Sequence, residues 1–217
     1  MLRFAEEILL LALDDATGKL LPLPDRALDF ALAGSVLAEL TFQGRITTDP
    51  KHVMIVDSSP TGDPVLDEVV QNLPESDQER TLHNCLTRVA AQGHRLRDRT
   101  LQGLMNKGIL KCEDDRFLWV FHLRRYPVVD DREEKEVRRR IRDVVLKEEK
   151  PGPRDVVLIA LMNVCQLSYT VFTEEELERV GDRIQTVASM DFIGQAMTNA
   201  IDRIQRAILE IRAYSGI

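Results

Sequence analysis

Apolar residues recur along most of this chain at the three- and four-residue spacing that puts side chains on one face of a helix. The pattern predicts about eight helices, of which the longest cover residues 25–43, 130–149 and 191–214. Residues 2–15 and 156–167 are apolar almost all round, so we expect these two helices to be buried on every side.

Residues that favour helix ends lie where the apolar runs start and stop. Asp63 precedes one run, and Thr173 with Glu176 forms a capping box before another, so both positions are predicted N-caps. Gly44 and Gly108 follow the last periodic residues of two further runs, where a residue of positive φ commonly ends a helix. These four positions set predicted helix boundaries.

Two stretches between the helices are rich in the branched and aromatic residues of strands. Residues 45–57 contain two short runs around a tight turn, which predicts a first small β-hairpin. A second hairpin is predicted from strands at 109–112 and 117–123, joined by an acidic turn at 113–115.

The 217 residues, 44% hydrophobic and 30% charged, are typical of a soluble globular protein. We find no internal repeat, low-complexity tract or long linker. The sequence therefore predicts a mainly α fold: a single compact helical domain over residues 1–217, with about eight helices and two short β-hairpins. The second hairpin is expected to project near 109–124.

Nothing in the sequence predicts export or a membrane span. No run approaches the roughly 18 consecutive apolar residues of a transmembrane helix, and Glu6 and Glu7 stand where a signal peptide would carry bases. The three cysteines are far apart and odd in number, which fits a reducing compartment. We therefore predict a cytoplasmic protein.

The charge is unevenly distributed along the chain. The net charge of −7 argues against general affinity for nucleic acid. Residues 94–147 nevertheless hold 15 Lys and Arg against 10 Asp and Glu, which leaves 14 against 26 elsewhere. Such a surplus can steer a protein toward an anionic surface, although a solvated face of mixed charge is the default explanation of a charge run.

The helix predicted over residues 94–107 has a basic outer face and an unusual inner one. Arg95 and Arg99 fall on the outer face, whereas Arg97 and His94 fall on the side of the apolar Leu101. An arginine on a packed face must be paired or must face a polar pocket, because an unpaired buried charge is very costly. A salt bridge is the commoner explanation, and a pocket for an anion is the alternative.

The predicted second hairpin carries an apolar segment with arginines on both sides. These apolar residues are Phe117, Leu118, Trp119, Val120 and Phe121. Arg124 and Arg125 follow them and, with Arg95 and Arg99, form the predicted basic surface. Tryptophan and arginine are favoured in membrane and protein interfaces, and burial in the core is the competing explanation. A helix followed by a ribbon is also typical of winged-helix DNA-binding proteins.

Motifs for catalysis or cofactor binding are absent from the sequence. The four histidines lie in separate elements, and there is no HExxH, paired-cysteine or calcium-loop pattern. No phosphate-binding glycine loop or nucleophile elbow occurs either. We therefore predict no catalytic residues, no metal and no cofactor, and expect a protein that is not an enzyme.

Several segments together resemble one known family. They are AEEILLLALDD at 5–15, LAGSVLAEL at 32–40, PTGDPVLDE at 60–68, LRDR at 96–99 and KGIL at 107–110. In this order and spacing, and with the aromatic ribbon that follows, the chain resembles the Golgi phosphoprotein 3 family over nearly its whole length. That resemblance favours this fold over a winged helix.

The resemblance implies a peripheral adaptor on the cytosolic face of Golgi membranes. Such an adaptor binds phosphatidylinositol 4-phosphate and hands glycosyltransferase tails to vesicle coats. The family's two headgroup arginines on the helix before the hairpin fall here on His94 and Arg97, of which only Arg97 matches. The tryptophan and arginine of the opposite wall fall near Pro24 and Ala33, so Arg26 is the candidate substitute.

The family's hairpin inserts into membranes or joins subunits, which implies the same for residues 117–121. The long basic N-terminal tail of eukaryotic members is missing, so we expect a prokaryotic or minimal member. The leading hypothesis is a non-enzymatic adaptor whose partner is an anionic phospholipid or another phosphate-bearing ligand, bound by Arg97, His94 and Arg26. The alternatives are a winged-helix-like DNA-binding regulator, although nucleic acid is an unlikely partner for an acidic chain, and a homo-oligomeric scaffold joined through the hairpin.

Overall fold

The computed structural model describes residues 2–49, 51–76, 78–115, 123–191 and 193. Within these ranges the chain is mainly helical, as predicted. The helices are α1 (Phe4–Leu11), α2 (Ala27–Phe42), α3 (Pro64–Gln71), α4 (Leu82–Ala90), α5 (Gly93–Asn106), α6 (Arg132–Leu146), α7 (Pro153–Val164), a short 3-10 helix η1 (Ser168–Thr170) and α8 (Glu174–Ala188). The strands are β1 (Ile46–Thr48), β2 (Val53–Ile55), β3 (Glu113–Asp115) and β4 (Leu123–Arg125).

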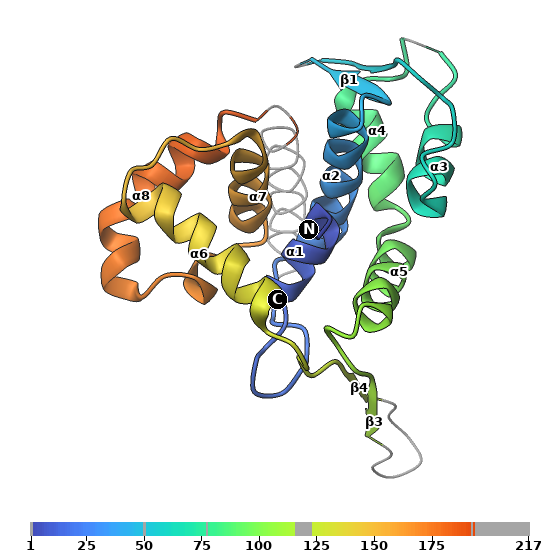
Figure 1. Cartoon of the computed structure of the whole chain (residues 1–217). Coiled ribbons are helices and arrows are strands. Elements are labelled where there is room, and N and C mark those ends of the chain that lie inside the picture. Colours follow the sequence, from blue (N-terminus) through green and yellow to red (C-terminus); the bar gives the residue numbers. More distant parts are fainter. Residues whose placement is uncertain (1, 50, 77, 116–122, 192, 194–217) are drawn as a thin grey trace, which may run out of the picture.

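Helices α1 and α2 form the centre of the molecule. Helices α3, α4 and α5 lie on one side of this pair, and α6, α7 and α8 lie on the other (Figure 1). The pair is central because both helices are apolar almost all round, so neighbours must cover every face. Phe4, Ile8, Leu32 and Leu37 are among its fully buried side chains.

The predicted helix ends are confirmed. The Asp63 carboxylate accepts a hydrogen bond from the Val65 N–H at 2.8 Å and caps α3. Thr173 caps α8 in the predicted capping box with Glu176. Gly44 and Gly108 follow α2 and α5 with φ of +67° and +71°, which a side chain would disfavour.

The first hairpin is confirmed, and the second differs from the prediction. Residues 113–115 are not a turn but a strand, β3, paired antiparallel with β4. The register puts Glu113 opposite Arg125, and opposite charges across an antiparallel pair stabilise it. We call β3 and β4 the ribbon, which extends away from the helices (Figure 1). Most of the strand predicted at 117–123, like the helix predicted at 191–214, lies outside the described residues.

Buried ion pairs join the central helices to α6 and α7. Glu7 of α1, only 2% exposed, accepts hydrogen bonds from Arg140 at 3.2 Å and from Arg154 at 3.4 Å. Burial raises the pKa of Glu7 by more than these two arginines lower it. Arg140 also lies 3.4 Å from Asp155, and Arg154 stacks over the Phe4 ring.

The α6 arginines Arg138, Arg140 and Arg142 are paired with carboxylates of their own and neighbouring helices. Arg138 and Arg140 are only about one-fifth exposed, and Arg138 pairs with Glu134 at 2.6 Å. Arg142 pairs with Glu176 of α8, also at 2.6 Å. A charged periodic pattern in the sequence does not reveal which carboxylates the neighbouring helices supply.

Candidate functional site

Arg26 begins the candidate site at the start of α2. It is the N-cap residue of this helix and takes the left-handed conformation, with φ of +62°. Its Nη2 donates a hydrogen bond to the Ala90 carbonyl at 3.3 Å, and its guanidinium carbon lies 5.3 Å from the centre of the Phe30 ring. Arg26 thus reaches from α2 to the end of α4, three residues before α5 begins.

Asp29 and Gly93 hold the starts of α2 and α5 against each other. A Cβ added to Gly93 would overlap the Asp29 carboxylate, so only glycine admits this approach. The other Asp29 oxygen lies 3.6 Å from Nε of Arg26. The Asp29 carboxylate is therefore fixed between Arg26 and the backbone of Gly93.

His94 and Arg97 follow Gly93 on α5. The prediction that His94 leans inward was wrong: its side chain is 78% exposed, and its Nδ1 lies 3.3 Å from Asp98. The i, i+4 spacing on a helix brings these two side chains together. Arg97 is half-buried, at 31% exposure, and its Nε lies 3.8 Å from Asp98. This separation is too long for a hydrogen bond.

Contacts thus join Arg26 to Asp29 and Asp29 to Gly93, and His94 and Arg97 follow Gly93 in the first turns of α5. We call Arg26, Asp29, Gly93, His94 and Arg97 the α2–α5 junction. Its arginines remain partly exposed, and the contacts described here with carboxylates are 3.6 and 3.8 Å long. Partly exposed guanidinium groups of this kind can bind a phosphate or a carboxylate.

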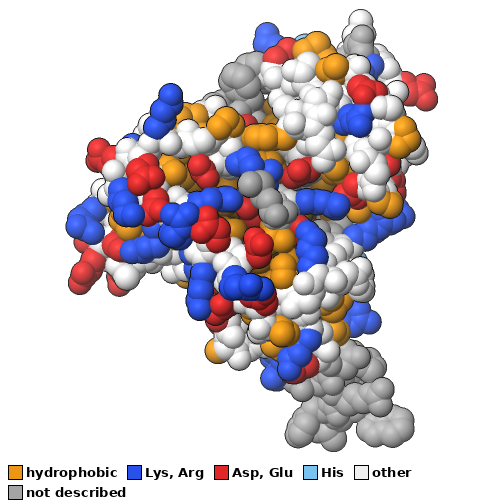
Figure 2. Space-filling model, viewed as in Figure 1, with side chains coloured by type: hydrophobic (Ala, Val, Ile, Leu, Met, Phe, Trp, Pro, Cys, Tyr) orange, Lys and Arg blue, Asp and Glu red, His pale blue; other side chains and the backbone are white. Residues whose placement is uncertain are grey.

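The residues of the predicted basic surface are engaged with carboxylates or lie on the ribbon. Arg95 and Arg99 both pair with Glu68 of α3, Arg99 at 3.1 Å. Arg124 and Arg125 lie on β4, opposite Asp114 and Glu113 in the register. The predicted apolar residues, Phe117, Leu118, Trp119, Val120 and Phe121, lie outside the described residues. Figure 2 shows acidic and basic side chains interspersed on the face of the molecule that it presents.

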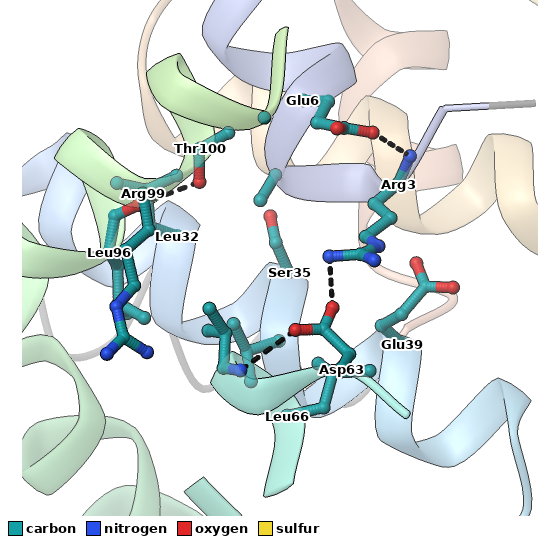
Figure 3. Close-up of a pocket in the computed structure, with 14 residues that line it drawn as sticks. Arg3, Glu6, Leu32, Ser35, Glu39, Asp63, Leu66, Leu96, Arg99 and Thr100 are labelled. Carbon is teal, nitrogen blue, oxygen red and sulfur yellow. Dashed lines mark hydrogen bonds and ion pairs between the residues drawn. The ribbon is translucent and has the colours of Figure 1, made fainter. Parts of the chain in front are cut away.

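A separate pocket lies between α1, α2, α3 and α5, and the sequence analysis did not predict it. It holds about 60 Å³, and Leu32 and Leu66 form part of its apolar wall. In Figure 3 the Arg3 guanidinium reaches across it to the buried Asp63, with which it pairs, and Glu39 lies beside it. Its charged lining residues are Glu6, Glu39 and Asp63 against Arg3 and Arg99, so their net charge does not favour an anion. Among the residues that line this pocket, Asp63 was predicted from the sequence only as a helix cap.

The described residues contain no group of three His, Cys, Asp or Glu side chains that could hold a metal ion. Among the same residues, no helix is both long and apolar enough to cross a membrane. The junction and the ribbon lie at opposite ends of α5. Fold and site together define a mainly helical protein with a charged helix junction and a projecting ribbon (Figure 1).

The chain belongs to the Golgi phosphoprotein 3 (GPP34) family, whose model matches residues 4–204. Vacuolar protein sorting-associated protein 74 of Eremothecium gossypii is similar to it, with 30% identity over 72% of this chain and 51% of the relative. The chain thus spans about half the length of that relative. The resemblance inferred from the sequence motifs is confirmed.

Proposed function

We propose that this protein is a non-enzymatic adaptor that binds an anionic headgroup of the phosphatidylinositol 4-phosphate type at the α2–α5 junction. Membership of the Golgi phosphoprotein 3 family supports an adaptor rather than an enzyme, as does the name of its relative, a protein associated with vacuolar protein sorting. In this proposal the protein lies peripherally on the cytosolic face of a membrane. Arg26 and Arg97 bind the phosphate, and His94 stands beside them.

The conformation of Arg26 carries the proposal. The left-handed conformation costs a non-glycine residue about 1–2 kcal/mol, and Arg26 makes no capping hydrogen bond in return. Glu148 and Gln166 share this conformation, but each follows the end of a helix, where it is common. At this N-cap position asparagine or glycine would adopt the left-handed conformation at a lower cost than Arg26. An arginine that keeps this backbone strain supports a functional role for its side chain.

The ribbon supplies the second contact in this proposal. Residues 117–121 hold the chain's only tryptophan, and β3 and β4 lead to them. Aromatic residues with arginines beside them suit the boundary between lipid and water. The axis of α5 separates the junction from the ribbon by about 20 Å.

DNA binding is the weaker candidate because the two arginines expected to contact DNA already pair with a carboxylate. Arg95 and Arg99, which would face the DNA, both pair with Glu68 of α3. A homo-oligomer joined through the ribbon would leave the α2–α5 junction free to bind a headgroup, because the two lie at opposite ends of α5, but it would take the place of the ribbon's contact with lipid.

Replacing Arg26 with glycine should separate binding from stability. We expect the wild-type protein to sediment with phosphatidylcholine vesicles that contain phosphatidylinositol 4-phosphate, and not with phosphatidylcholine alone. In Arg26→Gly the apparent affinity should fall about tenfold, since a hydrogen bond to a charged group is lost. The free energy of unfolding should stay within about 1 kcal/mol of wild type, because glycine relieves the left-handed strain.

Vesicle sedimentation and urea unfolding measure these two quantities. If the wild type does not sediment with the phosphoinositide vesicles, the proposed function is wrong. If Arg26→Gly loses its stability but keeps its affinity, Arg26 serves only to hold α2 against α4.

A further inference from the structure

We propose that Asp29 is a built-in competitor of the anionic ligand and limits how tightly the α2–α5 junction binds it. This inference rests on the proposed function and adds a specificity-determining residue to the same site. It starts from one contact: the Asp29 carboxylate occupies the space between Arg26 and Gly93.

The position of the Asp29 side chain depends on the close packing of α2 against the start of α5. Because Gly93 has no side chain, the carboxylate packs directly against the start of α5, and any larger residue at 93 would displace it. Asp29 is held there from another helix, in the first turn of α2. Its second oxygen lies 3.6 Å from Nε of Arg26. The Arg26 guanidinium is one of the two that bind the ligand in the proposed function.

The charges of the junction nearly cancel when no ligand is bound. Arg26 and Arg97 supply two fixed positive charges, and Asp29 and Asp98 lie 3.6 and 3.8 Å from them with two negative charges. Asp98 also contacts His94. A phosphate monoester carries a charge of about −1.5 to −2, so it must turn Arg26 away from Asp29 or bind beside a carboxylate that repels it.

Asp29 and Asp98 lie on different helices: Asp98 is on α5 with Arg97, whereas Asp29 is on α2. Asp98 lies next to Arg97 in the sequence and is half exposed, so it can move aside with its own side chain. Asp29, with 36% of its side chain exposed, reaches the site from α2 and packs against Gly93. The cost of binding an anion at the junction is therefore set mainly by Asp29.

Removing this one charge should strengthen binding. We expect Asp29→Asn to lower the vesicle concentration for half-maximal sedimentation about fivefold, which is the effect of one unit charge at close range in a well-solvated site. Asparagine keeps the shape of the side chain, and Asp29→Ser provides a second variant. The control Asp182→Asn removes the same charge from the exposed face of α8.

The experiment uses the full chain, vesicles of phosphatidylcholine with phosphatidylinositol 4-phosphate, and the five proteins wild type, Asp29→Asn, Asp29→Ser, Asp182→Asn and Arg97→Ala. Tighter binding by Asp29→Asn and Asp29→Ser, but not by Asp182→Asn, supports the inference. Equal gains in Asp29→Asn and Asp182→Asn would indicate a bulk charge effect and overturn it. Weaker binding by Arg97→Ala with no change in Asp29→Asn and Asp29→Ser would overturn the role of Asp29 and leave the proposed function standing. Unchanged binding by Arg97→Ala would overturn the proposed function itself.

Discussion

Replacing Arg97 with glutamate is expected to abolish the sedimentation of this protein with vesicles that contain phosphatidylinositol 4-phosphate. The substitution removes a guanidinium that could hold the phosphate and adds a carboxylate beside Asp98. A hydrogen bond to a charged group contributes about 1.5–3 kcal/mol, and like-charge repulsion adds to that loss. The apparent affinity should therefore fall by more than about tenfold.

Arg179→Glu is the matched control for this experiment. It makes the same change of charge on the exposed face of α8, far along the chain from the junction. We expect it to reduce binding only slightly, by the general loss of attraction to an acidic surface. Equal losses in Arg97→Glu and Arg179→Glu would mean that net charge, and not the α2–α5 junction, governs binding.

Replacing Glu7 with alanine should destabilise the fold by about 3 kcal/mol, since removing one member of a buried ion pair leaves the other charge unpaired. Arg140 and Arg154 would both lose this partner while remaining only about one-fifth exposed. Asp155 compensates in part for Arg140, and Glu39, at 3.8 Å, compensates weakly for Arg154. Urea unfolding with an unchanged slope would measure the loss.

Glu136→Ala is the comparison for Glu7→Ala. Glu136 belongs to the same kind of arginine pair, with Arg139 at 2.7 Å, but both side chains are about half exposed or more. Its loss should change the free energy of unfolding by less than about 1 kcal/mol, as for most surface ion pairs. A similarly small change in Glu7→Ala would show that the buried network contributes little to stability.

Local signals in the sequence were enough to predict much of this fold. Asp63 and Thr173 cap helices because their side chains satisfy N–H groups two or three residues ahead, and this depends only on nearby residues. Gly44 and Gly108 end helices for a similarly local reason. The apolar patterns of residues 2–15 and 156–167 also predicted the burial of α1 and α7.

The contacts between distant elements could not be predicted in this way. Glu7 was assigned to an apolar buried helix, but its partners Arg140 and Arg154 lie more than a hundred residues further on. The approach of Asp29 to Gly93 likewise depends on how α2 and α5 pack. The acidic run at 113–115 suggested a turn because its basic partner strand follows only after several intervening residues.

In the candidate site, too, the sequence indicated individual residues but not the contacts between them. The family resemblance directed attention to Arg97, His94 and Arg26 by position alone. Only the structure reveals that Arg26 holds a left-handed conformation and that His94 is exposed beside Asp98. The pocket behind Arg3 and Asp63 arises from four separate helices, so no local pattern announces it.

The most direct test of the central claim locates the ligand on the protein. Short-chain phosphatidylinositol 4-phosphate would be titrated into the isotopically labelled protein while backbone amide shifts are followed by NMR. We predict that the largest shifts fall at the α2–α5 junction, on Arg26, Gly93, His94 and Arg97. Shifts centred instead on the pocket of Arg3 and Asp63, or none at saturating lipid, would contradict the claim that this junction binds an anionic headgroup.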